Sequence, residues 1–199
     1  QHEQLPLIED DVYRELWLDD EPPQPIKAFD KNGLVLYLGS LSKSLSPGLR
    51  IGWMVGPEAV IDHLADIKMQ TDYGSSSLSQ WAAVEWLSSD LYSEHLNDVR
   101  KQLKIRRDFT LETLNMYFSN IAVWDQPTGG FYIWLRLLPS LSMRKLFEKA
   151  LSEGILLNPG NIYDHQADQY LRLSYSFASL PEIEVSLKRL SEMIKALAE

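Results

Sequence analysis

Short apolar runs recur along the chain, and turn residues separate them. Runs bounded by Gly, Pro, Asn or Asp indicate buried strands. We expect strands at residues 5–8, 34–38, 51–55, 123–124, 130–135, 155–157 and 171–174. The first two runs are apolar on both faces, which is typical of strands inside a parallel sheet.

Amphipathic segments lie between these runs, and their apolar residues repeat with helical spacing. We expect helices near residues 60–67 and at 79–87, 91–118, 142–153 and 181–198. Ser142 is a predicted N-cap, Gly154 a predicted helix end, and Pro181 a first-turn proline.

The alternation of strands and helices predicts an α/β fold with a small α+β part. The sequence pattern changes near residues 118–122, where the long amphipathic helix gives way to short strands and turns. We therefore expect one domain over residues 1–120, which includes a long connecting helix, and a smaller domain over residues 121–199. The first strand needs neighbours that the chain does not visibly supply, so we expect a fragment of a larger domain.

Composition narrows the functional classes. The chain has 199 residues, of which 45% are hydrophobic and 24% charged, as in ordinary globular proteins. Its 19 Lys and Arg against 28 Asp and Glu give a net charge of -9, so this stretch alone is a poor nucleic-acid binder. Cysteine is absent, which excludes disulfides and thiolate sites and fits a cytoplasmic protein. No apolar run reaches the ~20 residues of a membrane span.

Lys43 is the strongest candidate for chemistry. It follows the expected strand 34–38, and ligands of open α/β sheets bind at the carboxyl ends of strands. Hydroxyl groups at Ser40, Ser42 and Ser44, together with Arg50, are suited to hold a phosphate. A partly desolvated lysine beside a phosphate site is typical of Schiff-base chemistry. The alternative is a surface loop with solvated Lys and Arg side chains.

A second candidate group closes the first expected strand. Asp10 stands where that strand ends, and Tyr13 follows three residues later. A carboxylate buried there needs a cation as its partner, and a protonated pyridine nitrogen is one such cation. The alternative is a helix N-cap formed by Asp10 or Asp11.

These residues together resemble a known family. The motifs Asp10-x-x-Tyr13, Ser40-x-Ser42-Lys43 and Pro47-Gly48-x-Arg50-x-Gly52, followed by Arg172-Leu-Ser, resemble pyridoxal-phosphate enzymes of aminotransferase fold type I, classes I and II. The strings Ile8–Leu16 and Tyr37–Arg50 most resemble the MocR-type regulators of the GntR family. Those regulators join a winged-helix DNA-binding domain to an aminotransferase-like domain.

The resemblance implies a role for each matching residue. Lys43 would form the aldimine with pyridoxal phosphate and shuttle the proton in an active enzyme. Asp10 would pair with the pyridine nitrogen, and Tyr13 would hydrogen-bond the ring hydroxyl. Ser40, Arg50 and, more weakly, Ser42 would hold the phosphate. Arg172 would bind the α-carboxylate of a substrate; the alternative is an ordinary strand arginine that faces solvent.

The resemblance also implies function and partners. It suggests a regulator that senses the cofactor or a small amino compound and binds DNA only through a domain outside this chain. A free-standing aminotransferase is the alternative, and a module that only dimerises is a third possibility. In the family the site lies at a homodimer interface, which would involve residues 72–77. Other cofactor elements of the family precede the Asp10 strand, so we expect the isolated chain to be inactive.

Other motifs carry less weight. Ser40-x-x-Lys43 and Ser142-x-x-Lys145 match the nucleophile motif of penicillin-recognising enzymes, but that chemistry also needs Ser-Asp-Asn and Lys-Thr-Gly elements, which are absent. The four histidines lack metal-ligand spacing, so we expect no metal site. We interpret the basic residues of 100–107 as a solvated helix face, and the six tryptophans as core residues.

Overall fold

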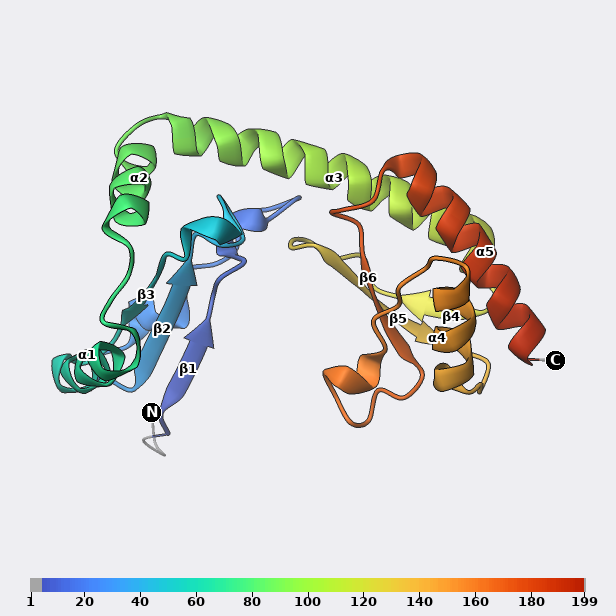
Figure 1. The fold of residues 1–199 in the computed structure, drawn as a ribbon, viewed down its shortest axis with the longest axis horizontal. Coiled ribbons are helices and arrows are strands. Elements are labelled where there is room, and N and C mark those ends of the chain that lie inside the picture. The colour runs from blue at the N-terminus through green and yellow to red at the C-terminus, as the bar shows by residue number, and fades with distance from the viewer. Residues whose placement is uncertain (1–4, 199) are drawn as a thin grey trace. The chain divides into compact units, whose positions relative to one another are not determined.

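The computed structural model describes residues 5–198 (Figure 1). The chain forms two compact units: the first ends at Arg100, and the second begins at Lys101. The division falls within helix α3 (Leu91–Phe118). Residues 1–4 and 199, where the two expected domains begin and end, lie outside the described residues.

A three-stranded sheet organises the first unit, with strand order β1-β2-β3. β1 (Leu7–Asp10) pairs in parallel with β2 (Val35–Ser40), and β3 (Gly52–Val55) pairs with β2 in the antiparallel direction. The helices of this unit are α1 (Glu58–Asp72), α2 (Ser77–Leu87), the start of α3 and the short 3-10 turns Arg14–Leu16, Ile26–Phe29 and Pro47–Leu49.

The predicted burial of the first strand is wrong. Leu7 and Ile8 are exposed, and the strand begins two residues later than expected, so that Asp10 belongs to it. Within the described part of this sheet β1 is an edge strand, and β2 is the strand with a neighbour on each side. Val35 and Gly39 of β2 are accordingly buried. The position of a strand in its sheet therefore decided its burial.

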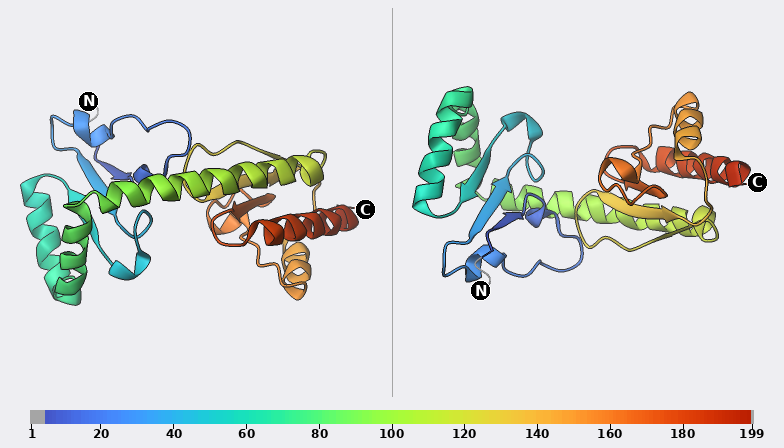
Figure 2. Two further views of the ribbon diagram at one scale, coloured as in Figure 1. Left: turned by 90° about the horizontal axis from the view of Figure 1, so that it is seen from above. Right: turned by 90° about the horizontal axis from the view of Figure 1, so that it is seen from below.

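The second unit is built on an antiparallel sheet with the order β4-β5-β6. The strands are β4 (Ala122–Trp124), β5 (Tyr132–Leu137) and β6 (Tyr170–Ser174), and the helices are α4 (Met143–Ser152), α5 (Leu180–Ala198) and the 3-10 turn η4 (Gly160–Ile162). Ile133, Leu135 and Leu171 are fully buried on one face of this sheet. Helices α4 and α5 lie next to each other in every view (Figures 1 and 2).

The predicted helix ends of the second unit are confirmed. Oγ of Ser142 accepts a hydrogen bond from the backbone N–H of Lys145, as an N-cap does. Gly154 has φ 79°, the left-handed conformation that ends α4. Pro181 lies in the first turn of α5.

The predicted strand at 155–157 is wrong. The backbone N–H of Ile155 donates a 2.9 Å hydrogen bond to the carbonyl of Ala150, so this residue completes the end of α4. Only Pro159 forms an isolated bridge to Leu171 of β6. The apolar side chains of this segment are compatible with a strand. The N–H of Ile155, however, is hydrogen-bonded within the turn that ends α4 and cannot pair with a strand.

The predicted solvated basic face is also wrong in part. Lys101 is exposed, but Arg107 is only 1% exposed and donates a 2.9 Å hydrogen bond to the carbonyl of Pro127. Arg106 donates through Nε to the carbonyl of Tyr175 at 2.7 Å. These two arginines donate hydrogen bonds to carbonyl groups inside the second unit. The pattern of charges along the helix did not indicate these bonds.

The expectation that the tryptophans form the core is likewise wrong, because none of the six is buried. Trp53, Trp81 and Trp134 are exposed, and the other three are half-buried. Trp53 instead lies flat against Gly39, where a Cβ would collide with the indole ring.

Candidate functional site

The Lys43 loop, residues 41–50, connects β2 to β3. Its base is the fully buried Leu41, whose carbonyl accepts hydrogen bonds from the N–H groups of Leu45 and Ser46 at 2.9 and 3.0 Å. The loop is therefore a closed turn that directly follows the last residue of β2, Ser40. Lys43 stands at its exposed outer side.

The structure brings Lys43 and Tyr13 together. The ammonium group of Lys43 lies 5.6 Å from the centroid of the Tyr13 ring, a cation–π arrangement. Tyr13 reaches this position because β1 runs parallel to β2, so that the turn after β1 and the loop after β2 meet at the same edge. Lys43 remains exposed, so the described residues do not provide the desolvation that we expected.

The residues proposed to hold a phosphate also cluster. Nη1 of Arg50 donates to Oγ of Ser42 at 3.4 Å and to the carbonyl of Pro47 at 3.0 Å. Oγ of Ser40 accepts from the N–H of Ser42 at 3.1 Å and donates to the carbonyl of Ile51 at 3.2 Å. Arg50 has φ 56°, which is uncommon for a residue with a side chain.

The charge balance of this cluster fits an anion. Among the ion pairs of residues 5–198, none joins Lys43 or Arg50 to a carboxylate. Two exposed cations and neighbouring serine hydroxyls are a donor set that suits a phosphate group.

Asp10 lies at the carboxyl end of β1, as predicted, and is exposed. Its Oδ1 accepts a 3.4 Å hydrogen bond from the N–H of Val12. Neither Asp10 nor Asp11 is an N-cap, because the turn that follows begins after Tyr13 and has no side-chain cap. Within residues 5–198, no hydrogen bond or ion pair joins Asp10 to Lys43.

Ser44 has a different role from the one that its hydroxyl suggested. It is only 3% exposed, and its Oγ accepts a 2.9 Å hydrogen bond from the hydroxyl of Tyr92. Nε2 of His95 lies 3.0 Å from the Ser44 carbonyl. Ser44 thus anchors the loop to α3 and does not face a phosphate. The flanking Leu41 and Leu45 were the sequence signal for a loop with one buried side.

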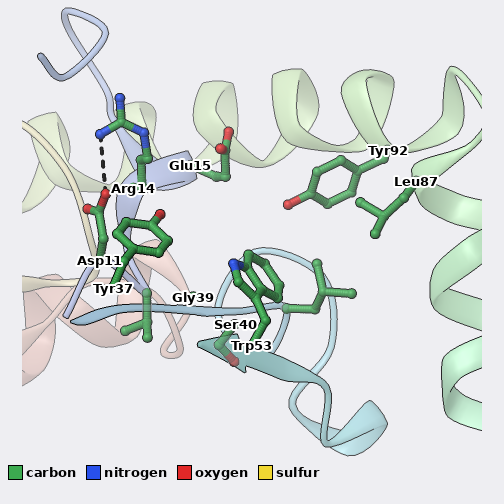
Figure 3. Close-up of a pocket in the computed structure, with 11 residues that line it drawn as sticks. Asp11, Arg14, Glu15, Tyr37, Gly39, Ser40, Trp53, Leu87 and Tyr92 are labelled. Carbon is green, nitrogen blue, oxygen red and sulfur yellow. Dashed lines mark hydrogen bonds and ion pairs between the residues drawn. The ribbon is translucent and has the colours of Figure 1, made fainter. Parts of the chain in front are cut away.

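A pocket of about 300 Å³ lies beside this loop in the first unit (Figure 3). Asp11, Tyr37, Trp53 and Tyr92 contribute to its lining, and Ser40 reaches it from the end of β2. Asp11 forms a 3.2 Å ion pair with Arg14 at its rim. Burial and the neighbouring Asp11 carboxylate raise the pKa of Tyr37.

Arg172 lies on β6 in the second unit. Its guanidinium carbon is 4.0 Å from the centroid of the Tyr132 ring and 3.9 Å from that of the Tyr163 ring. Nε of Arg172 is buried without a hydrogen-bond partner in the described chain. A cavity of about 440 Å³ adjoins this residue, with Asn158 and Glu182 among the polar residues of its wall.

Two further kinds of feature are absent from residues 5–198. No helix there is both long and apolar enough to cross a membrane. No cluster of three or more His, Cys, Asp or Glu there has a geometry that could hold a metal ion.

Comparisons with known proteins identify the family of the chain. Residues 1–190 match the family model of aminotransferase class I and II. The chain is 58% identical over 195 residues to "Uncharacterized HTH-type transcriptional regulator YdfD" of Bacillus subtilis, and 42% identical over 192 residues to the HTH-type transcriptional regulator NorG of Staphylococcus aureus. These alignments cover 98% and 96% of this chain but only 40% and 43% of the relatives.

Solved aminotransferases share the fold. The kynurenine aminotransferase of Pyrococcus horikoshii matches with a TM-score of 0.91 and 34% identity, over 96% of this chain and 48% of the enzyme. LysN, the alpha-aminoadipate aminotransferase of Thermus thermophilus in complex with N-(5'-phosphopyridoxyl)-L-leucine, matches with a TM-score of 0.91 and 30% identity, over 98% and 51%. The predicted fold class and resemblance are therefore confirmed, and the chain spans about half of that fold.

Proposed function

Because this chain belongs to the aminotransferase class I and II family, we propose that it is part of the effector domain of a MocR-type transcriptional regulator, which binds pyridoxal phosphate and senses a small amino compound. The higher identity to HTH-type regulators, 58% and 42%, than to the solved enzymes, 34% and 30%, supports a regulator. DNA binding would belong to a segment outside this chain, as its net charge of -9 suggests. A DNA-binding regulator acts in the cytoplasm.

One observation carries the cofactor proposal: two exposed cations without carboxylate partners in the described chain share a serine-rich loop beside a tyrosine ring. Arg50 and Ser42 would hold the phosphate, and Ser40 would join them after its hydroxyl turns away from the Ile51 carbonyl. Nζ of Lys43 would form the covalent attachment.

Two further residues would contact the ring. Asp10, whose carboxylate is exposed at the end of β1, would pair with the pyridine nitrogen, and Tyr13 would donate to the ring hydroxyl. When bound, pyridoxal phosphate supplies an aldehyde that bonds to amines and a ring that withdraws electrons.

Arg172 would bind the carboxylate of the amino compound. No described residue accepts a hydrogen bond from its guanidinium, so its Nη groups keep their donors for a ligand. A guanidinium edge binds a carboxylate through two parallel hydrogen bonds. This assignment makes an amino acid, and not a simple amine, the expected ligand.

Borohydride trapping tests the proposal in the longest natural protein that contains this chain. After incubation with pyridoxal phosphate and reduction, peptide mass spectrometry should find the pyridoxyl group on Lys43. Lys43→Ala should abolish the label, whereas the control Lys31→Ala, in an exposed turn, should keep it. A label that survives Lys43→Ala would overturn the assignment.

A free-standing aminotransferase is the second candidate, because the fold matches solved aminotransferases at a TM-score of 0.91. Such an enzyme would convert bound pyridoxal phosphate to pyridoxamine phosphate in a single turnover with an amino acid. A regulator would instead change its affinity for DNA when the amino acid binds.

We also propose that the protein forms a homodimer through the segment around residues 72–77. Tyr73 is 93% exposed with φ 56°, and the exposed apolar Leu78 and Trp81 follow on α2. Exposed apolar patches of this kind mark interfaces. Sedimentation analysis should find a dimer that Trp81→Glu dissociates. A dimer without cofactor binding would support the third possibility, a module that only dimerises.

A further inference from the structure

Two tyrosine rings lie against the Arg172 guanidinium. Tyr132 lies on β5 and Tyr163 follows η4, and their ring centroids lie 4.0 and 3.9 Å from the guanidinium carbon. With two rings against the guanidinium carbon and no hydrogen bond to a described residue, its Nη groups are left for a ligand. A carboxylate binds a guanidinium in its plane, through two parallel hydrogen bonds at its edge.

Two other arginines of this unit, Arg106 and Arg107, show what a structural arginine does here. Arg106 donates to the carbonyls of Tyr175 and Ala178, and Arg107 donates to the carbonyl of Pro127. Arg172 makes no side-chain hydrogen bond to a described residue, although its Nε is buried. Stacking therefore holds this guanidinium, and its Nη donors remain unused.

The sheet and a tight turn place the two rings. Tyr132 lies opposite Ser174 on β6, which makes it a diagonal neighbour of Arg172 on the same face of the sheet. Tyr163 is held by a 2.8 Å hydrogen bond from its N–H to the carbonyl of Gly160. Gly160 is buried against Tyr170 and Ala167, where a Cβ would lie 2.5 Å from the Tyr170 Cβ and 2.7 Å from the Ala167 carbonyl oxygen.

A third aromatic residue supports the outer ring. Trp134 pairs with Arg172 across the strands and packs edge-on against Tyr163, with ring centroids 6.2 Å apart. Its other neighbour is Tyr170, which stacks on it at 5.4 Å. The backbone of Tyr163 is therefore fixed by the Gly160 turn, and its ring is fixed by Trp134 of the sheet.

We propose that Tyr132 and Tyr163 are positioning residues, which hold the Arg172 guanidinium edge-on so that the site selects a ligand with a carboxylate over the corresponding amine. This inference rests on the proposed role of Arg172. It adds that selectivity depends on the rings themselves and not on the phenol hydroxyls, because the guanidinium contacts the ring faces. Phenylalanine can therefore replace either tyrosine, and leucine cannot.

Two probes that differ in one group test this inference. N-(5'-phosphopyridoxyl)-L-leucine carries a carboxylate, and its analogue made from 3-methylbutylamine lacks it; both share the cofactor half and the side chain. Isothermal titration of the longest natural protein that contains this chain gives the ratio of the two dissociation constants. We expect a ratio of about tenfold or more in favour of the carboxylate probe.

Variants distinguish the contribution of the aromatic ring to this ratio from that of the phenol hydroxyl. Tyr132→Leu and Tyr163→Leu should each reduce the ratio roughly threefold to tenfold by weakening the carboxylate probe alone. Tyr132→Phe and Tyr163→Phe should keep the wild-type ratio. Tyr117→Leu, at a half-buried tyrosine of α3 with no ring contact to Arg172 in the described chain, is the control and should stay within about twofold.

Failure of this inference is distinguishable from failure of the proposed function. Arg172→Leu should lower the ratio to about one. If it does and the leucine variants of the tyrosines keep the wild-type ratio, the positioning role is overturned. If Arg172→Leu has no effect, the carboxylate-binding role of Arg172 is overturned. If neither probe binds the wild-type protein, the cofactor site itself is refuted. Unaffected binding of the amine probe shows that a variant is folded.

Discussion

The hydroxyl of Tyr92 donates a 2.9 Å hydrogen bond to Oγ of Ser44 and thereby ties the residue next to Lys43 to helix α3. Burial raises the pKa of Tyr92. Ser44 is almost fully buried, and His95 contacts its carbonyl from the next turn of the helix. The candidate cofactor loop is therefore held from its inner side.

Loss of this anchor should loosen the loop. Tyr92→Phe removes the donor and leaves the buried Ser44 hydroxyl without it, which should cost about 1 kcal/mol in the free energy of unfolding. The affinity for pyridoxal phosphate should fall as well, because Lys43 is part of the same loop. Urea unfolding and cofactor titration measure the two effects. Tyr117→Phe, at a half-buried tyrosine of α3 outside the candidate site, should change neither; equal values for Tyr92→Phe and wild type would refute the anchor.

Gly160 should not tolerate a side chain. In Gly160→Ala the new Cβ would meet the backbone oxygen of Ala167 at 2.7 Å, which cannot move cheaply. We expect a loss of about 2 kcal/mol in the free energy of unfolding. The selectivity of Arg172 for a carboxylate should also fall, since Tyr163 moves with this turn. Gly48→Ala, where the nearest atom lies at 3.7 Å, is the control for stability. A stable Gly160→Ala protein would contradict the packing of this turn.

Arg107 should stabilise the second unit far more than the exposed Lys101 of the same helix. Arg107→Met keeps the length of the side chain but removes its hydrogen bond to the Pro127 carbonyl and its ion pair with Asp108. We expect a cost of about 3 kcal/mol, because a buried acceptor loses a charged donor. Lys101→Met, at an exposed position, should change stability by less than about 0.5 kcal/mol. Chemical denaturation compares the two, and similar losses would refute the distinction.

Asp30 should make the first unit sensitive to acid. The hydrogen bond from Lys27 holds the pKa of Asp30 well below its ordinary value, and the N–H groups of Val35, Leu34 and Asn32 lower it further. A carboxyl with a depressed pKa stabilises the fold above its unfolded pKa near 3.8, and this stabilisation is lost as the pH falls below that value.

The effect can be isolated with Asp30→Asn. The free energy of unfolding of the wild type should decline more steeply than that of Asp30→Asn as the pH falls below about 4. Asp20→Asn, at an exposed loop position, provides the control and should follow the wild type. Parallel pH profiles for wild type and Asp30→Asn would show that Asp30 does not contribute.

Local patterns predicted most elements because the responsible forces act over a few residues. The N-cap at Ser142, the end of α4 at Gly154 and the start of α5 near Pro181 depend on backbone groups within one turn. The family motifs likewise indicated which loop carries Lys43 and Arg50. The prediction of a strand at 155–157 was wrong because it rested on apolar side chains alone. In the structure the N–H of Ile155 is hydrogen-bonded in the turn that ends α4.

The sequence alone determined the α/β class, the family resemblance and the identity of the residues in the candidate site, since these depend on residue type and spacing. Only the tertiary structure decided which polar groups have partners. Ser44, Arg106 and Arg107 turn inward to hydrogen bonds with residues far along the chain, whereas Arg172 is held between Tyr132 and Tyr163 with its donors unused. Burial and hydrogen-bond partners depend on segments that come together only in the folded chain, and a local sequence pattern does not indicate them.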